Sequence, residues 1–288
     1  MATNTVGIIG GTGILGRPVV REFVRRGFRV RLLVRRLETA RALFPQGVDF
    51  ATGSLAELES LRKAAEGVDL VYLNLPATHS PTAPFIAERD GMRQLLRAVP
   101  RHVPILKLSE IGASHNPDFV DITLKHESEK LLAQAGNPFV IFRPTWFMES
   151  FPYLLTKFKA ITYFGQHVHP VYWLAGQDYA RMVVTAAEKL GQVQNQVFTM
   201  QGPELLTFRE AAQRYIQAYD RTLKLLNLPL WLAAVPARFS GEWLFNHQVM
   251  SYYDKRQEVF ESQAAWNLLG APTTTIEQFA KSLVPISF

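Results

Sequence analysis

A run of small residues near the start of the chain, Gly10–Gly16, has the composition and spacing of a phosphate-binding loop. It contains the pattern G-x-x-G-x-x-G. In such a loop the first glycine allows a tight turn, the second lets the backbone approach a pyrophosphate, and the third lets the following helix pack closely. Amides at the helix start then point towards the phosphates. A purely structural turn is the alternative. The residues expected to contact a dinucleotide are Gly10, Thr12, Gly13, Ile14, Leu15 and Gly16.

Two arginines, Arg35 and Arg36, follow the next apolar run and bear on the choice of dinucleotide. A protein that prefers NADH places Asp or Glu here to accept the ribose 2′-hydroxyl. This chain has no carboxylate until Glu38. A guanidinium can instead fork onto a 2′-phosphate, and the Thr12 hydroxyl could add a donor. The pair therefore favours NADPH over NADH, with two merely solvated arginines as the alternative.

Composition and charge exclude several other classes of protein. The 288 residues are 48% hydrophobic and 19% charged, which is typical of a globular chain, and none is cysteine. Disulfide frameworks, thiolate metal sites and cysteine nucleophiles are therefore excluded. The net charge is +6, but residues 17–41 alone hold nine Arg and two Glu. Because the basic character is confined to one short segment, nucleic acid is not expected as a partner.

A phosphate-binding loop needs a strand before it and a helix after it. The first half of this chain contains such strand-like and helix-like segments in alternation. Apolar runs alternate with segments of helical periodicity through residue 144, which predicts right-handed crossovers and a doubly wound parallel sheet of the Rossmann type. The expected strands are Val6–Ile9, Phe28–Val34, Val48–Thr52, Asp69–Leu75, Val103–Leu108 and Phe139–Arg143. The expected helices are Arg17–Arg26, Leu37–Leu43, Glu57–Glu66, Pro84–Ala98 and Ile122–Ala135.

After Pro144 this rhythm breaks, and a smaller, mainly helical C-terminal lobe is expected. Residues 1–144 form the dinucleotide-binding domain, to which the chain returns at about 170–200 with a helix at Asp178–Lys189 and a strand at Val197–Met200. Residues 145–169 and 201–288 form the lobe for a substrate or a partner. The apolar stretch Leu223–Phe239 is too short and too interrupted to span a membrane, so a buried helical segment is expected there. No signal or transit peptide is expected before Val6.

Several short motifs follow one another in a characteristic order. They are Gly10–Gly16, Leu33-Val34-Arg35, Gly53-Ser54-Leu55 with Ser60-Leu61, Lys107-Leu108-Ser109, Glu129-Lys130-Leu131-Leu132, Phe142-Arg143-Pro144, Phe147-Met148-Glu149, and Gly202-Pro203 followed by Thr207-Phe208. Together these motifs resemble the NmrA-like family of the atypical short-chain dehydrogenase/reductase superfamily. The resemblance implies a Rossmann domain with a C-terminal lobe, Ser54 and Leu55 near an adenine, and Leu75 and Pro76 near a nicotinamide.

The same resemblance places Lys125 where active superfamily members carry the Lys of a Ser–Tyr–Lys triad. The Tyr position holds Asp121 and the Ser position holds Ile111, so the triad is represented by Lys125 alone. Reduction of a quinone needs little general-acid catalysis, and Lys125 could both hold the nicotinamide ribose and supply the proton. A Lys on the surface of an amphipathic helix is the alternative. No metal is expected, because His167 and His169, which would share one side of a strand, have no third ligand nearby. His126 is expected to be solvated, and His79 is a weak substrate-site candidate.

Two functions fit these observations. The first is an NADPH-dependent cytoplasmic oxidoreductase that transfers hydride to a small apolar quinone or conjugated carbonyl. An aromatic segment favours it by offering a stacking pocket. The second is a dinucleotide-sensing regulator or assembly factor without turnover, whose partner is a regulated protein, and the depleted triad favours that. The aromatic residues concerned are Trp146, Phe147, Phe151, Tyr153, Phe158, Tyr163 and Phe164.

Overall fold

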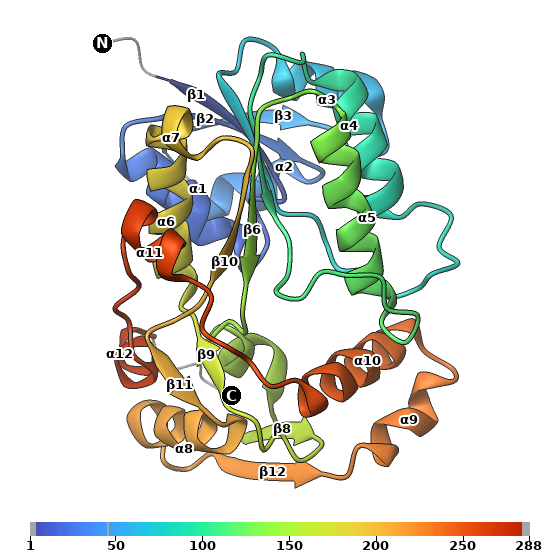
Figure 1. The fold of residues 1–288 in the computed structure, drawn as a ribbon, viewed down its shortest axis with the longest axis vertical. Coiled ribbons are helices and arrows are strands. Elements are labelled where there is room, and N and C mark those ends of the chain that lie inside the picture. Colours follow the sequence, from blue (N-terminus) through green and yellow to red (C-terminus); the bar gives the residue numbers. More distant parts are fainter. Residues whose placement is uncertain (1–3, 45, 284–288) are drawn as a thin grey trace.

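The computed structural model describes residues 4–44 and 46–283 and is built on one parallel sheet of seven strands. The strands are β1 (Thr5–Ile9), β2 (Arg29–Val34), β3 (Val48–Thr52), β4 (Leu70–Leu73), β5 (Ile105–Leu108), β6 (Phe139–Pro144) and β10 (Gln196–Met200). They lie in the order β10-β6-β5-β4-β1-β2-β3, and every neighbouring pair is parallel (Figure 1). The order reverses between β1 and β4, which confirms the doubly wound Rossmann-type prediction.

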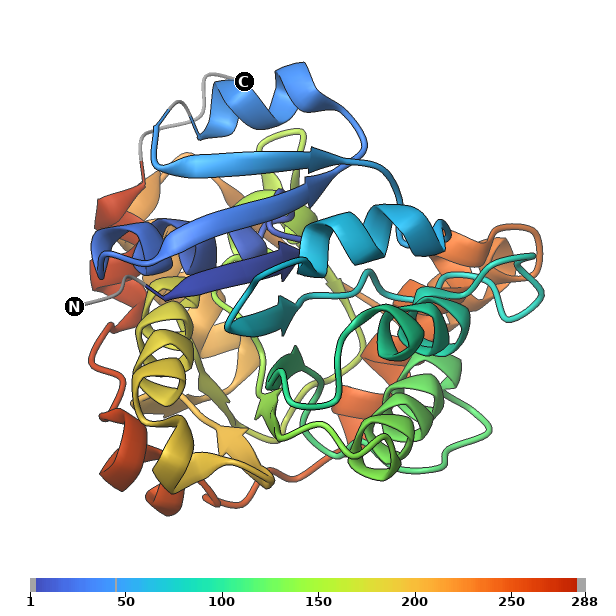
Figure 2. The ribbon, with the colours of Figure 1, turned by 90° about the horizontal axis from the view of Figure 1, so that it is seen from above.

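Helices cover both faces of this sheet, as Figures 1 and 2 show. One face carries α1 (Gly16–Arg25), α2 (Leu37–Leu43), α6 (Gly176–Glu188), α7 (Leu190–Val193) and α11 (Gln263–Leu269). The other face carries α3 (Leu58–Ala65), α4 (Met92–Ala98) and α5 (Val120–Gln134). Because each crossover places its helix on one face or the other, both faces of the sheet are buried, as a parallel sheet requires.

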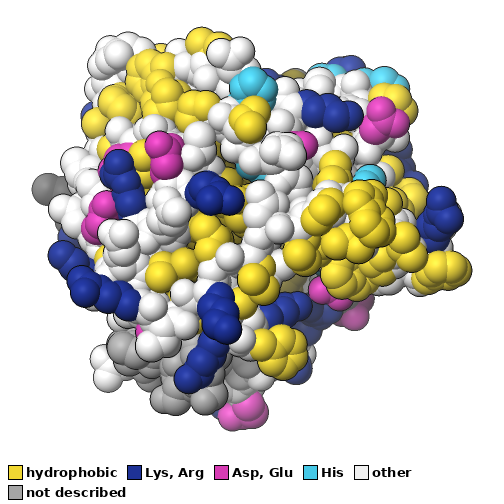
Figure 3. Space-filling view, turned by 90° about the horizontal axis from the view of Figure 1, so that it is seen from below, with side chains coloured by type: hydrophobic (Ala, Val, Ile, Leu, Met, Phe, Trp, Pro, Cys, Tyr) yellow, Lys and Arg dark blue, Asp and Glu magenta, His cyan; other side chains and the backbone are white. Residues whose placement is uncertain are grey.

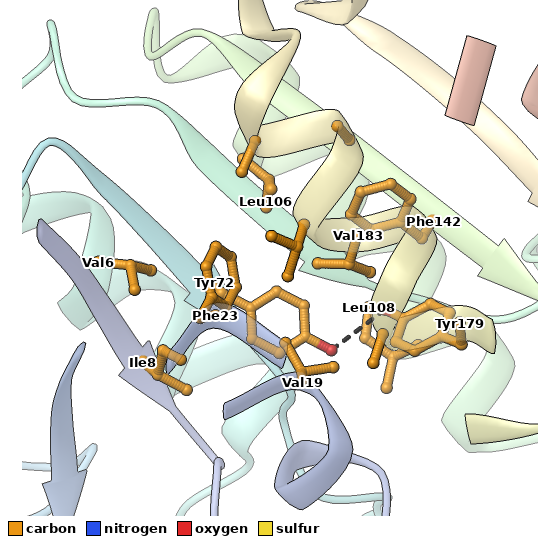
Figure 4. Close-up of a cluster of buried hydrophobic side chains, with 14 of the residues drawn as sticks. Val6, Ile8, Val19, Phe23, Tyr72, Leu106, Leu108, Phe142, Tyr179 and Val183 are labelled. Carbon is orange, nitrogen blue, oxygen red and sulfur yellow. Dashed lines mark hydrogen bonds between the residues drawn. The ribbon is translucent and has the colours of Figure 1, made fainter. Parts of the chain in front are cut away.

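The period-two alternation of the strands divides the core into two parts. Ile8 and Leu32 pack on the side of α1 and α6, whereas Ile9 and Leu33 pack on the side of α3 and α4. In the first part the hydroxyl groups of Tyr72 and Tyr179 lie 3.1 Å apart and share a hydrogen bond between sheet and helix (Figure 4). A buried phenol needs such a partner, so this bond fixes how α6 sits on the sheet.

A smaller lobe follows the sheet domain and contains both helices and two small sheets. Its second core gathers aromatic rings such as Phe151, Trp173, Phe208 and Tyr215. The two small sheets were not expected from the sequence, because their strands are only two to five residues long. The strands of the lobe are β7 (Thr156–Lys157), β8 (Ala160–Phe164), β9 (Val171–Trp173), β11 (Glu204–Leu206) and β12 (Lys224–Leu228). Its helices are α8 (Phe208–Tyr219), α9 (Trp231–Ala237), α10 (Gly241–Lys255) and α12 (Ile276–Ser282).

The prediction of a buried helix across Leu223–Phe239 is wrong. Its first half is the strand β12, which pairs with β8, and its second half is α9. Because α9 packs mainly against α10, its other face stays open: Trp231 is 65% exposed and Phe239, just beyond the helix, is 87% exposed. Hydrophobic side chains gather over α9 on the right of the lower face (Figure 3). Within the described residues no helix has the length and apolar character that crossing a membrane requires.

Two local features also differ from the sequence-based expectation. The helix expected over Pro84–Ala98 begins only at Ala87, and its first five residues, through Gly91, are π-helical. The carbonyl of Ile86 accepts hydrogen bonds from three successive amides there, which widens the turn. His167 and His169 do not share a strand, because both lie in the loop between β8 and β9, where His167 has a φ of 44° and its amide donates to Asp254.

A buried carboxyl, Glu149, ties the start of the lobe to α6. Its Oε1 accepts the Gly176 amide at 2.8 Å, and a Cβ on Gly176 would lie 2.6 Å from that oxygen. The other carboxyl oxygen, Oε2, has no hydrogen-bond partner. Burial raises the pKa of Glu149 to about 7, although the Gly176 amide opposes this shift. The fold therefore prefers the protonated form of this group.

We expect the protein to become less stable as the pH rises, because the buried Glu149 carboxyl then ionises. A carboxyl whose pKa is higher in the folded than in the unfolded state stabilises the fold. This stabilisation is complete at a pH below the unfolded-state pKa, and it is lost as the pH rises through the folded-state pKa of about 7. Between pH 5 and pH 8 the wild type should lose roughly 2–3 kcal/mol more unfolding free energy than Glu149→Gln does. Urea unfolding across this range measures the difference, with the exposed Glu127→Gln as control. Parallel pH curves for wild type and Glu149→Gln would contradict it.

Candidate active site

The candidate site lies at the carboxyl edge of the sheet, where the strand order reverses. In open α/β sheets the loops after two oppositely directed crossovers leave a crevice at such a point. Here these are the loops after β1 and β4. They touch directly, because Gly10 has a φ of 82° and a Cβ there would lie 1.8 Å from the backbone oxygen of Asn74. Only glycine fits this contact.

The glycine loop has the geometry that its spacing predicts. Gly16 begins α1 and packs against the turn: a Cβ there would meet the Gly10 oxygen at 2.3 Å and the Gly11 Cα at 2.7 Å. Gly13 differs, because it is exposed and a Cβ there would meet nothing closer than 3.4 Å, which is ordinary contact. The protein itself does not require glycine at position 13, so the space beside it suits a group from outside the chain.

That space also suits an anion. The N-cap residue of α1, Leu15, makes no side-chain capping bond, and no acidic residue lies in the first turn of the helix. The partial positive charge of the helix start is therefore not compensated by the protein. Arg17 adds a guanidinium in the first turn, held by a 2.8 Å bond from its Nε to the Thr12 carbonyl. A pyrophosphate fits this arrangement of charge and space.

Arg35 and Arg36 lie beside this loop, at the carboxyl end of β2, the strand next to β1. Both side chains are exposed, and among the described residues neither guanidinium has a hydrogen bond or a carboxylate partner. The chain continues through β3 to Ser54 and Leu55, and the Gly53 amide bonds to the Val34 carbonyl at 2.9 Å. The four predicted residues thus lie at one corner of the carboxyl edge, with two guanidinium groups free to bind an anion.

Leu75 and Pro76 follow β4 on the other side of the reversal point. Leu75 is buried in the core, whereas Pro76 is exposed at the edge. Two residues later the Thr78 amide donates a 2.6 Å bond to Oδ1 of Asp121, at the start of α5. This bond joins the loop after β4 to the helix that carries Lys125.

Lys125 is buried in a cluster of charges and is not the surface residue of the alternative interpretation. Its Nζ lies 2.9 Å from Oε1 of Glu88 and 3.8 Å from Oδ2 of Asp121. Lys107, in β5, lies 2.9 Å from the other oxygen of Glu88. Burial alone would raise the pKa of Glu88, but the two ammonium groups lower it to about 2. Burial lowers the pKa of Lys125, but Glu88, Asp121 and Glu110 outweigh it and raise that pKa well above its usual value.

Sequence reasoning missed two members of this cluster, Glu88 and Lys107. Glu88 lies on the π-helical turn, within a segment that looks like an ordinary amphipathic helix. Lys107 could have been recognised from the sequence, because a single Lys in a short and otherwise apolar strand needs a buried partner of opposite charge. Glu129, on the same helix as Lys125, instead bonds Ser109 at 2.5 Å and pairs with Arg143, which holds the end of β5 against β6.

Two further expectations are corrected. The aromatic segment does not form one stacking pocket: Phe151 and Tyr163 lie in the core of the lobe, whereas Phe158 is 98% exposed at the turn between β7 and β8. His126 is not freely solvated, since its Nδ1 is buried without a partner. His79 is exposed at the site and packs on Phe245, with ring centroids 4.8 Å apart. In the part of the chain that is described, no three His, Asp or Glu side chains gather as metal ligands would.

Comparison with characterised proteins gives relatives of several kinds. An NAD(P)H azoreductase of Xenophilus azovorans is 27% identical over 231 residues, which cover 77% of each chain. The photosystem II assembly factor Ycf39 of Synechocystis is 25% identical over 83% of this chain and 76% of its own.

Solved structures share the fold. An NADPH-dependent quinone oxidoreductase of Escherichia coli superposes with a TM-score of 0.73 at 21% identity, covering 96% of this chain and 98% of its own. A triphenylmethane reductase of Citrobacter in complex with NADP(H) has a TM-score of 0.73 at 18% identity, over 97% and 100%. The sequence model of the NmrA-like family matches residues 2–277, almost the whole chain. The chain therefore belongs to the NmrA-like family.

Proposed function

We propose that this protein is an NADPH-binding oxidoreductase that transfers hydride to a small apolar quinone or conjugated carbonyl. The observation that carries the proposal is Gly13, a glycine that no contact within the protein requires, at an uncompensated helix start beside two unpaired guanidinium groups. Relatives named as an NAD(P)H azoreductase and a quinone oxidoreductase support a reductase. We place its activity in the cytoplasm.

In this proposal the cofactor lies across the strand reversal. The pyrophosphate occupies the space beside Gly13 and the amides of Ile14 and Leu15. Arg35 and Arg36 bind the 2′-phosphate, with the Thr12 hydroxyl as a further donor. Ser54 and Leu55 flank the adenine, while Leu75 and Pro76 border the nicotinamide half.

When bound, the cofactor supplies a hydride, and the residues of this chain supply position and charge. Lys125 is the ribose anchor: Glu88 and Asp121 fix its ammonium near the start of α5, and that ammonium carries three donors. Its raised pKa suits this role better than proton donation, because it keeps its proton throughout the neutral range. The Asp121–Thr78 bond holds the loop after β4 against the anchor.

A second function, a dinucleotide-sensing regulator or assembly factor without turnover, rests on a different observation. Ile111 is buried where the Ser of the triad is expected, and Asp121 accepts the Thr78 amide where a Tyr would reach the substrate. The relatives named as photosystem II assembly factors give it support. NADPH oxidation against a panel of quinones and enones separates the two: tight NADPH binding with no turnover for any acceptor favours the sensor.

The first prediction for this site concerns Gly13. Gly13→Val should fold normally but lose all measurable affinity for NADPH, because its branched side chain fills the space of the pyrophosphate. Calorimetry measures the affinity and circular dichroism checks the fold. Gly191→Val, at an exposed glycine whose Cβ would meet nothing within 4 Å, is the matched control. Unchanged affinity in a folded Gly13→Val would refute the assignment of the loop.

The second prediction concerns the choice of cofactor. Arg35→Glu should weaken NADPH binding by about 2–3 kcal/mol, since a charge-assisted contact is lost and repulsion is added. NADH binding should change little, because NADH lacks the 2′-phosphate. Arg101→Glu, at an exposed arginine before β5 on the opposite edge of the sheet, controls for net charge. A wild type that prefers NADH would show that the arginines do not bind a phosphate.

The third prediction concerns Lys125. Lys125→Met should lower turnover roughly 10²–10⁴-fold, the span associated with losing a positioning contact or an acid–base group. Asp121→Asn should lower turnover much less than Lys125→Met does, because Asp121 transfers no proton and its amide oxygen can still accept from the Thr78 amide. Steady-state NADPH oxidation measures both variants, after circular dichroism has confirmed their folds. Full activity in Lys125→Met would remove Lys125 from the mechanism.

A further inference from the structure

A carboxyl from the sheet domain and a phenol from the lobe meet at the edge of the candidate site. Glu110 lies two residues beyond β5, in a segment that runs alongside β6 because the amides of Ser109 and Ile111 bond to Phe142 and Pro144. The hydroxyl of Tyr253, on α10, donates a 2.6 Å bond to its Oε1. Glu110 is only partly buried, whereas Tyr253 is 6% exposed. The carboxyl is therefore held from the lobe side, on a residue that the protein does not fully enclose.

Charged groups from two helices act on Glu110. Asp121 and Lys125 approach it from α5, and Tyr253 and Arg256 approach it from α10 and its end. Burial and the Asp121 charge raise the pKa of Glu110 to about 7, although Lys125, Tyr253 and Arg256 oppose the rise. Burial is the larger of the two causes, and the charge of Asp121 adds to it. Glu110 therefore holds a proton more readily than an exposed carboxyl does.

We propose that Glu110 is the general acid of the reduction, and that Tyr253 is the positioning residue that aims it across the boundary between domain and lobe. The proposal rests on the proposed function. It supplies the proton donor that the missing triad Tyr leaves open. The position is suitable because the loop after β5 borders the loop after β4, where the nicotinamide half is placed. A group that titrates near the operating pH also serves best as a general acid.

The step balances as follows. Hydride from NADPH adds to the quinone or conjugated carbonyl, and the bond from nicotinamide C4 to that hydrogen breaks, which leaves NADP⁺. The negative charge that develops on the acceptor oxygen takes the proton of Glu110 Oε2, so that an O–H bond forms and the reduced product is neutral. The Glu110 carboxylate left behind is stabilised by the Tyr253 hydroxyl on Oε1 and by Lys125. Water then returns the proton.

The pH dependence of kcat for 1,4-naphthoquinone reduction at saturating NADPH tests this proposal. In the wild type kcat should fall as pH rises through about 7, because Glu110 loses its proton. Glu110→Gln should lower kcat roughly 10²-fold at pH 6 and abolish this fall, with the KM for NADPH within twofold of the wild type. Glu127→Gln, an exposed carboxyl on α5, is the matched control and should keep both the rate and the profile.

Tyr253→Phe gives a readout that a merely structural contact would not move. The Tyr253 bond lowers the pKa of Glu110, so its removal should shift the fall of kcat to higher pH. This variant also keeps the test decisive if Glu110→Gln does not fold. Two outcomes in an enzyme that is active as wild type would overturn the role of Glu110 but not the proposed function. One is a Glu110→Gln variant with unchanged kcat and pH profile, and the other is a folded Tyr253→Phe variant with an unchanged pH profile. A wild type that binds NADPH but reduces no acceptor overturns the proposed oxidoreductase, and the role of Glu110 with it.

Discussion

The arrangement of the candidate site depends on one fully buried carboxylate, Glu88. Such a group is costly to desolvate and stays ionised only with close partners of opposite charge. Lys107 from the sheet and Lys125 from α5 supply them at 2.9 Å each. The π-helical turn, the inner strand β5 and the helix α5 are thereby tied to a single point. Lys125 then lies 3.8 Å from Asp121, which in turn accepts the Thr78 amide, so the position of the loop after β4 follows from this pairing.

The parallel sheet and its glycine loop could be predicted because their signals are local. Apolar runs separated by segments of helical period identify the strands, and the pattern Gly10–Gly16 sits where β1 ends and α1 begins. The return of the chain to add a seventh strand, β10, also follows from a short apolar run. Each of these features depends on residues a few positions apart, which is the range over which sequence periodicity is informative.

Other parts of the site depend on residues distant in the chain. Glu110 and Tyr253 are separated by 143 positions, and neither has a neighbour in the sequence that indicates the other. The lobe is held in a similar way: Glu258 accepts bonds from Thr145 and Gln201, and Asp178 accepts the amides of Thr273 and Thr274. The prediction that the aromatic residues in 146–164 form one stacking pocket is wrong, because hydrophobicity alone does not distinguish residues of a core from residues that line a cleft. Local patterns cannot specify such pairings, since they are set by tertiary packing.

The glycine loop combines two kinds of constraint within seven residues. Gly10 and Gly16 are required by contacts inside the protein, and any side chain there would collide with backbone. Gly13 meets no such obstacle. Selection for folding therefore maintains the first two, whereas packing within the protein places no such demand on the third. In a lineage that abandoned the ligand, substitutions would accumulate at position 13 while the glycines on either side persisted, so this single position would record whether the loop is still in use.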